Sequence, residues 1–266
     1  MGGSDRRAGA VKASLYCGCT SSSMIQALHG FGGDGEDFSL VRTASKHTWC
    51  CMDLLGHGRS WKSTESKDYR VQEQTKMVAA KVKGEFLLGY SMGARLALHT
   101  VLKYPDLWRG LIMISGTAGL TSGREQRKTW DQDLVKRLQT DTNKEFWEYW
   151  SQVPIIQSQA RVDEDFRNRR DGRRQKSNLN SLAASILGFG AGVMPSVWDL
   201  LHEVGLPVLL IVGEEDTKYW RLGKELHAKL SQSELHVVPD AGHAPHMENP
   251  RVVAEIIDGW INSLLQ

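Results

Sequence analysis

Short apolar runs alternate with longer polar stretches along most of the chain, and apolar runs of this length are typical of buried strands. The predicted strands are one near Val11–Tyr16 and then Met24–Leu28, Trp49–Met52, Glu85–Leu88, Gly110–Ser115, Leu206–Val212 and Leu235–Val238. Helical patterns fall between them at residues 65–83, Ala94–Leu102 and Asn249–Leu265. This alternation predicts an α/β fold with a mostly parallel central sheet flanked by helices.

The strand rhythm stops between Thr121 and Leu201, where polar helical segments take over. These segments carry a group of large aromatic side chains, namely Trp130, Phe146, Trp147, Tyr149, Trp150, Phe166 and Trp198. Because strands resume afterwards, we interpret residues 121–201 as a helical lid inserted into one domain. The core of that domain would then comprise residues 1–120 and 202–266.

Composition narrows the class of protein. The chain has 266 residues, with 33 lysines and arginines against 31 aspartates and glutamates, so its formal charge is only +2. This balance gives no global basic field, and we therefore expect neither a nucleic acid nor a membrane as a partner. Hydrophobic residues make up 41% of the chain, but no run approaches the ~18 apolar residues of a membrane-spanning helix. These features indicate a soluble globular protein.

The cysteines and the N-terminus suggest no cofactor and no secretory route. Cys17 with Cys19, and Cys50 with Cys51, fit the ligand spacing of a zinc site poorly, so we expect buried reduced thiols and no metal. The first 23 residues lack the apolar core of a signal peptide, although their Ser- and Arg-rich, acid-poor composition weakly resembles a transit peptide. We expect a cytoplasmic protein, or a plastid one if the source is photosynthetic.

The sequence Gly89-x-Ser91-x-Gly93 lies between a predicted strand and a predicted helix. Glycines at both positions permit a turn so tight that the serine hydroxyl projects above the edge of the sheet. The N-terminus of the following helix adds a positive field at that point. In this placement the motif predicts a nucleophile elbow and hence an α/β-hydrolase fold.

A reactive serine needs a base, and the base needs an acid that orients it. In this fold the acid and the histidine follow the serine along the chain, each in a loop after a strand. Asp216 and His243 occupy such loops, which makes Ser91, Asp216 and His243 the candidate triad. The competing residues are Glu214, Glu215 and His246, whereas His57 is more consistent with a structural role.

A negative charge that develops in such a site is stabilised by two backbone N–H groups. Met92 directly follows the candidate nucleophile and should supply one of them. The loop His29-Gly30-Phe31-Gly32 follows an early strand, and it places the N–H of Phe31 where the second is needed. The predicted oxyanion hole therefore consists of Phe31 and Met92.

Arginine is concentrated in one part of the chain. Eleven of the eighteen arginines lie between Arg95 and Arg174, mostly in the predicted lid. Arg95 comes four residues after Ser91, so one helical turn places both on the same face. Each lid arginine could instead lie on a solvent-exposed helix face, because acidic residues are interspersed among them. The cluster nevertheless favours a small ligand with several carboxylates.

Several further motifs resemble one particular family. The quoted elements are Gly89-Tyr90-Ser91-Met92-Gly93-Ala94-Arg95, His29-Gly30-Phe31, Gly119-Leu120, Arg124-x-x-Arg127-x-x-x-Asp131, Trp150-x-x-x-Pro154, Pro195-Ser196-x-Trp198, Gly213-Glu214-x-Asp216-x-Lys218 and Ala241-Gly242-His243. Together they resemble the MenH family, the 2-succinyl-6-hydroxy-2,4-cyclohexadiene-1-carboxylate synthases of menaquinone and phylloquinone biosynthesis. The resemblance extends over roughly residues 24–265.

The resemblance implies a lyase on a hydrolase scaffold, which eliminates pyruvate from 2-succinyl-5-enolpyruvyl-6-hydroxy-3-cyclohexene-1-carboxylate. Ser91 would then act as a base, and no water would be consumed. The matching positions imply that Arg95, Arg127 and Arg174 hold substrate carboxylates, with Tyr90, Trp150 and Lys218 lining the site. The register across the Arg-rich stretch 167–174 leaves Arg174 the least secure of these.

Two other classes of function remain open at this point. A serine esterase or carbon–carbon bond hydrolase would use the same triad, although a pocket for neutral esters would gain nothing from Arg95 and Arg127. A binding protein of the same fold could also keep an intact triad. Turnover of any substrate would exclude the binding protein, and release of pyruvate would separate the lyase from the hydrolase. The oligomeric state is left open by the sequence.

Overall fold

The computed structural model describes residues 23–60 and 62–266. The strand predicted near Val11–Tyr16, together with Cys17 and Cys19, lies outside these residues. Within the described chain, no helix is both long enough and apolar enough to cross a bilayer.

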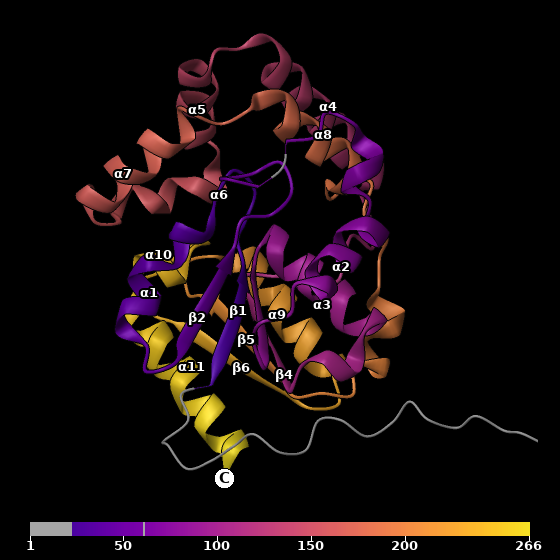
Figure 1. Ribbon diagram of the computed structural model, residues 1–266, viewed down its shortest axis with the longest axis vertical. Helices are drawn as coiled ribbons and strands as arrows, with labels where there is room; N and C mark the ends of the chain where they lie inside the picture. Colours follow the sequence, from indigo (N-terminus) through magenta and orange to yellow (C-terminus); the bar gives the residue numbers. More distant parts are fainter. Residues whose placement is uncertain (1–22, 61) are drawn as a thin grey trace, which may run out of the picture.

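Six described strands form one fully parallel sheet in the order β2-β1-β3-β4-β5-β6 (Figure 1). The strands are β1 Met24–Leu28, β2 Thr48–Met52, β3 Phe86–Tyr90, β4 Gly110–Ile114, β5 Val208–Gly213 and β6 Ser233–Val238. Each overlaps a strand that the apolar runs predict. Strands β3, β4 and β5 are buried throughout, as expected for a parallel sheet that is covered on both faces.

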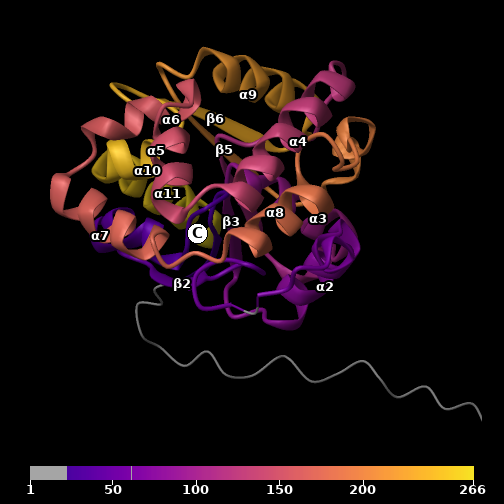
Figure 2. The same cartoon turned by 90° about the horizontal axis from the view of Figure 1, so that it is seen from above.

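Helices cover both faces of the sheet (Figure 2). One face packs against α2 Val71–Ala80, α3 Met92–Lys103 and α9 Thr217–Lys229. The other packs against α1 Ser39–Ala44, α10 Pro245–Glu248 and α11 Pro250–Leu265. Alternate residues of each strand enter opposite cores, so that Leu87 joins one and Leu88 the other.

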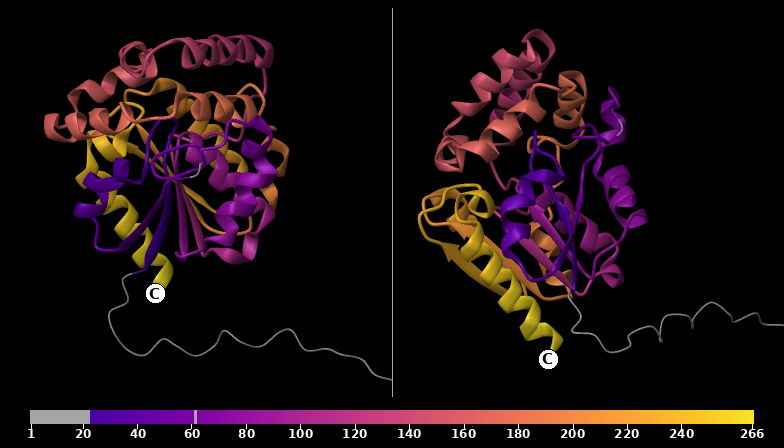
Figure 3. Two further views of the ribbon diagram at one scale, coloured as in Figure 1. Left: turned by 45° about the horizontal axis from the view of Figure 1, so that its top comes forward. Right: turned by 60° about the vertical axis from the view of Figure 1, so that its left-hand side comes forward.

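A third layer of helices lies over the carboxyl ends of the strands (Figure 3). It comprises α4 Arg124–Thr140, α5 Asn143–Ser151, α6 Pro154–Gln157, α7 Glu164–Arg174 and α8 Leu179–Phe189. We refer to residues 124–189 as the cap. The aromatic side chains of Phe146, Trp147 and Trp150 form its own small hydrophobic core with Leu134 and Leu182.

Short 3₁₀ helices complete the described secondary structure. They are η1 Gly35–Phe38, η2 Ser66–Tyr69, η3 Pro105–Leu107, η4 Ser158–Arg161 and η5 Trp198–Glu203. Two of them matter for the candidate site: η1 of the core contacts α7 through the Asp37–Arg173 ion pair, and η4 of the cap contacts Glu215 and Glu248 of the core through Arg161.

The single helix predicted over residues 65–83 is wrong. The chain forms η2, becomes extended at Arg70 and only then enters α2, which ends at Ala80. Tyr69 explains the break, because its side chain is fully buried and its hydroxyl donates a hydrogen bond to the Ser63 carbonyl at 2.6 Å. Burying this ring requires a turn that a continuous polar helix would not allow.

Cys50 and Cys51 are free thiols, as expected, but they are only half-buried. They are consecutive residues of strand β2. Side chains of consecutive strand residues point to opposite faces, which prevents a disulfide between them.

Candidate active site

Ser91 occupies a strained turn between β3 and α3. Its backbone has φ 52° and ψ −106°, a conformation that non-glycine residues rarely adopt. The turn is possible because Gly93 lies directly against β1: a Cβ at this position would come within 2.0 Å of the Leu28 carbonyl oxygen. The motif therefore forms the elbow that it predicts, with Ser91 at the N-terminus of a helix.

His243 links the hydroxyl of Ser91 to the carboxylate of Asp216. Its Nδ1 lies 2.7 Å from Asp216 Oδ2, and its Nε2 lies 2.9 Å from Ser91 Oγ. Because a carboxylate can only accept, Nδ1 carries the proton and Nε2 is free to accept the serine proton. The His243 and Asp216 side chains are 4% and 7% exposed, so little water competes for these bonds.

Asp216 has two roles. Its Oδ1 accepts a hydrogen bond from the Tyr219 N–H and caps the start of α9, while its Oδ2 holds His243. The competing residues have other partners. Glu215 is ion-paired with Arg161, and the ring of His246 packs on Tyr90 at 4.3 Å. Burial, together with nearby His243 and Arg170, lowers the pKa of His246 to about 3.

The loop after β1 is braced by His29. The ring Nε2 accepts from the Leu54 N–H at 2.9 Å, and Nδ1 donates to the Gly30 carbonyl at 2.7 Å. This fixes the loop beside Ser91, where Phe31 and Met92 line the same cavity. The ring of Phe31 meets Trp150 of the cap edge-on at 5.2 Å, so the predicted oxyanion loop also contacts the cap.

A cavity of about 960 Å³ lies between the carboxyl ends of the strands and the cap. Its lining includes all eleven residues singled out from the sequence, namely Phe31, Tyr90, Ser91, Met92, Arg95, Arg127, Trp150, Arg174, Asp216, Lys218 and His243. The cavity is large enough for a drug-sized organic ligand, and it mixes apolar walls with convergent cationic groups.

Arg95 projects from α3 into this cavity without an ionic partner among the described residues. Its Nη1 lies 3.4 Å from the Phe189 carbonyl oxygen and 3.5 Å from the sulfur of Met194, and its guanidinium lies over the Phe189 ring at 5.2 Å. Burial lowers the pKa of Arg95 to about 10. A charged donor thus lines the same cavity as Ser91, with most of its hydrogen-bonding capacity unused by the described residues.

Arg127 and Lys218 add positive charge on the same side of the cavity. Arg127 donates to Asp131 at 2.8 Å and lies over the ring of Trp130 at 4.6 Å. Lys218 lies on the first turn of α9, where part of the residue is exposed and its side chain lines the cavity. Burial of its ammonium, with Arg127 adding repulsion, lowers the pKa of Lys218.

Arg174 is the last residue of α7 and belongs to a different group of charges, with Arg170 and Asp37 nearby. Its Nε donates to the Gly32 carbonyl at 3.4 Å, and its guanidinium lies over Trp147 at 4.8 Å. Burial lowers the pKa of Arg174 to about 10. Arg170, one turn earlier, is also buried but donates to Gln159 at 2.8 Å.

Tyr90 forms part of the cavity wall between the two groups of cations. Its ring lies 5.5 Å from that of His243, and Gln159 of the cap donates to its hydroxyl at 3.5 Å. Burial raises the pKa of Tyr90 well above its ordinary value, so the hydroxyl stays protonated. Within residues 23–60 and 62–266, no group of three His, Cys, Asp or Glu side chains could hold a metal ion.

The alpha/beta hydrolase family model matches residues 27–256. A Bacillus subtilis (strain 168) protein, provisionally named a 2-succinyl-6-hydroxy-2,4-cyclohexadiene-1-carboxylate synthase, is 34% identical over 93% of both chains. This chain is an alpha/beta hydrolase of that synthase family. An Escherichia coli O1:K1 / APEC synthase of the same name is 29% identical over 84% of this chain and 87% of its own.

Three further proteins are similar to this synthase-family chain. The Arabidopsis thaliana protein PHYLLO, chloroplastic, is 28% identical over 86% of this chain, which spans only 15% of that protein. The solved structure of MenH from S. aureus has a TM-score of 0.87 at 23% identity and covers 95% of this chain and 98% of its own. A Thermogutta terrifontis esterase shares the fold, with a TM-score of 0.71 and 24% identity. The match covers 91% of this chain and 90% of the esterase chain.

Some residues of the site have no clear signal in the sequence. Tyr219 packs against His243 with ring centroids 4.5 Å apart, and only its place three residues after a helix-capping aspartate could have indicated it. Gln159 and the buried carboxylate of Asp37 also line the cavity. Their neighbours come from distant parts of the chain, so no local spacing identifies them.

Proposed function

We propose that this chain eliminates pyruvate from 2-succinyl-5-enolpyruvyl-6-hydroxy-3-cyclohexene-1-carboxylate and releases 2-succinyl-6-hydroxy-2,4-cyclohexadiene-1-carboxylate. It is then a lyase of menaquinone or phylloquinone biosynthesis. The similarity to the synthases over nearly the whole chain carries this conclusion. The unpaired Arg95 beside Ser91 supports it, because an anionic substrate would satisfy that charge.

The triad acts as a base in this reaction. His243 Nε2 takes the proton of Ser91 Oγ as the oxygen removes a ring proton from the substrate, with His243 held by Asp216. The electrons of the broken C–H bond form a ring double bond, and the C–O bond to the enolpyruvyl group breaks. The leaving enolate takes up a proton as it becomes pyruvate, so no water is consumed.

The N–H groups of Phe31 and Met92 stabilise the negative charge that builds up in the transition state. The substrate carries three carboxylates. Arg95 and Arg127 bind carboxylates in one part of the cavity, and Arg174 binds a carboxylate in another. Lys218 adds positive charge near Arg95 and Arg127. Tyr90 and Trp150 form walls. The Trp150 indole N–H is buried and makes no hydrogen bond to a described residue, which leaves it for the ligand.

We further propose that residues 121–201 are a lid within one domain made of residues 1–120 and 202–266, and that the cap closes the site from water. The protein works in a bacterial cytoplasm or, like the chloroplastic relative, in a plastid. It uses no cofactor and no nucleic-acid or membrane partner.

Ester hydrolysis by a serine hydrolase mechanism is the second candidate function. The distance of 2.9 Å between Ser91 Oγ and His243 Nε2 also suits activation of the serine for nucleophilic attack on an ester. It differs from the lyase reaction in forming an acyl-enzyme and in consuming water. Arg95 favours the lyase, since a neutral ester would leave its buried guanidinium without an ionic partner among the described residues.

Pyruvate release tests the proposal directly. The protein is incubated with the enolpyruvyl substrate, and pyruvate is followed through NADH oxidation by lactate dehydrogenase. We expect turnover, and Ser91→Ala should lower kcat by roughly 10³-fold or more because the base is lost. Rapid hydrolysis of p-nitrophenyl esters without any pyruvate would overturn the lyase and support the hydrolase.

A further inference from the structure

A second carboxylate lies directly beneath the loop that carries His243. Glu248 ends the short helix α10, and its side chain is fully buried. Its Oε2 accepts from the Gly242 N–H at 2.7 Å, and its Oε1 accepts from the Ala244 N–H at 3.0 Å. These two residues flank His243, so one carboxylate holds the backbone on both sides of the catalytic imidazole.

The same carboxylate is reached from the cap. Ser158, at the start of η4, donates its hydroxyl to Glu248 Oε1 at 3.0 Å. Arg161, at the end of η4, places its Nε 3.7 Å from Glu248 Oε2. Glu248 thus receives two backbone donors from the catalytic loop and two side chains from the cap.

Arg161 also reaches the loop that carries the acid of the triad. Its Nη1 donates to Glu215 Oε1 at 2.8 Å, and its Nη2 bonds the other oxygen of the same carboxylate. Glu215 directly precedes Asp216, and its own N–H donates to the Ala241 carbonyl at 2.9 Å. One arginine therefore ties η4 to the loops of both Asp216 and His243.

Close packing makes this junction specific. A Cβ on Gly242 would lie 2.3 Å from the hydroxyl oxygen of Ser158, so any other residue here would push the cap away from the loop. A buried carboxylate is costly unless its oxygens are satisfied, and Glu248 is satisfied only while the cap and the loop are both in place.

We propose that Glu248 is a positioning residue for His243. Through their contacts with Glu248, Ser158 and Arg161 couple the position of the cap on the core to the geometry of the triad. Loss of the contact lets the segment Gly242–Ala244 shift, which moves His243 Nε2 away from Ser91. The inference rests on the proposed role of His243 as the base, but it does not depend on which substrate the enzyme uses.

Glu248→Gln is the sharpest change, because the amide keeps the size and replaces one acceptor with a donor that must face a backbone N–H. A displacement of about 1 Å at a catalytic group can cost on the order of 100-fold in rate. We expect kcat for pyruvate release to fall by about 10- to 100-fold, with KM little changed because the arginines of the cavity are untouched. Glu255→Gln, an exposed change of the same charge on α11, is the matched control.

A second readout is independent of the substrate. A fluorophosphonate forms a bond to Ser91 Oγ and releases fluoride, while His243 accepts the serine proton. Its labelling rate should fall in Glu248→Gln by a factor similar to that in kcat. If the unchanged protein is labelled rapidly but releases no pyruvate, the proposed function fails and the positioning role can still be measured by labelling.

Ser158→Ala and Arg161→Gln test the coupling without removing the carboxylate. They still test the proposal if Glu248→Gln does not fold. Each should lower both rates several-fold while circular dichroism shows a folded protein. The inference is overturned if folded Glu248→Gln keeps the labelling rate and kcat of the control. It is equally overturned if both cap variants keep normal rates.

Discussion

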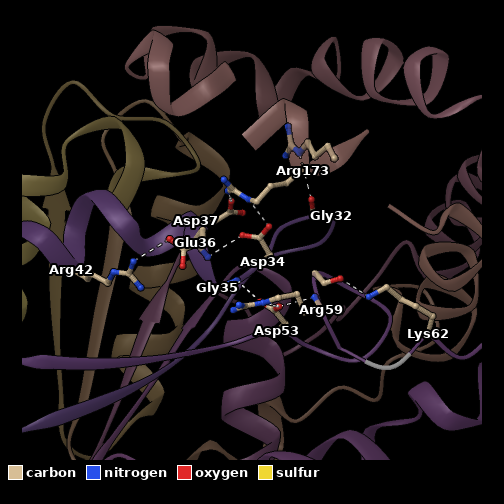
Figure 4. A network of polar contacts seen from close by, with 12 residues as sticks. Gly32, Asp34, Gly35, Glu36, Asp37, Arg42, Asp53, Arg59, Lys62 and Arg173 are labelled. Atoms are coloured by element: carbon tan, nitrogen blue, oxygen red, sulfur yellow. Dashed lines mark hydrogen bonds and ion pairs between the residues drawn. The ribbon is translucent and has the colours of Figure 1, made fainter. Parts of the chain in front are cut away.

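The arginines around the cavity differ in the partners that the protein gives them. At the junction between cap and core, Arg161 pairs with Glu215. At the same junction Arg173 donates to Asp34 at 2.6 Å and to Asp37 at 3.3 Å, as Figure 4 shows. We refer to Arg161 and Arg173 with these carboxylates as the seam. Inside the cavity, by contrast, Arg95 has no carboxylate partner among the described residues and contacts a carbonyl oxygen, a sulfur and the Phe189 ring.

This difference separates structural cations from cations available to a ligand. A paired guanidinium at a junction fixes two segments relative to each other. A buried one without a carboxylate is unfavourable for the empty protein, and the lowered pKa of Arg95, which burial causes, reflects that cost. Arg127 and Arg174 lie between these extremes. Arg127 is paired with Asp131 at 2.8 Å, whereas the ionic partner of Arg174 among the described residues is Asp171, at 3.7 Å.

Among the variants of these cations, the largest effect should come from Arg95→Met, which keeps most of the volume and removes the charge. Loss of a bidentate, charge-assisted pair should lower kcat/KM by about 100-fold or more, corresponding to ~3 kcal/mol. Stability should stay level or rise, because an uncompensated charge is removed. Steady-state pyruvate release and thermal unfolding measure the two quantities. Arg95→Lys keeps the charge and should lie in between. A large drop in Tm with normal KM would place Arg95 with the structural cations.

Arg173→Gln should lower stability more than activity, the opposite of Arg95→Met. It leaves Asp34 and Asp37 in largely buried surroundings without their cation, and we expect a loss of about 2 kcal/mol in the free energy of unfolding. For a chain of this length that corresponds to roughly 5 °C in Tm. The change in kcat/KM should be much smaller than for Arg95→Met. Arg169→Gln, exposed on the same helix, is the control. Equal Tm values for the two variants would contradict a structural role for the seam.

Lys218 should give the smallest effect, and it should depend on pH. Burial and the neighbouring Arg127 lower its pKa, so the ammonium becomes neutral at a lower pH than a free lysine. As the pH rises through that value, attraction for an anionic substrate weakens and KM should increase, by on the order of fivefold for an exposed pair. Lys218→Arg keeps its charge and should shift the increase to higher pH, whereas Lys224→Arg should not. An identical KM profile in all three proteins would exclude Lys218 from binding.

Much of the fold and of the triad could be predicted because the relevant signals are local. Apolar runs mark the strands, and the glycines around Ser91 mark a turn that few other residues could form. Asp216 and His243 follow from chain order, since consecutive strands of a parallel sheet end at one edge. The helix over 65–83 was mispredicted because polar periodicity carries no information about the burial of Tyr69.

Local patterns in the chain were enough to derive the layered α/β fold, the candidate triad and the concentration of arginine near it. Tertiary structure alone decided which arginines have partners and which face the cavity. It also decided that Glu248 supports the loop of His243. This is because the energetic contribution of a charged group depends on its burial and on nearby atoms that come from distant segments of the chain. Arg161 and Glu248, 87 positions apart in the numbering, illustrate a pairing that no local pattern encodes.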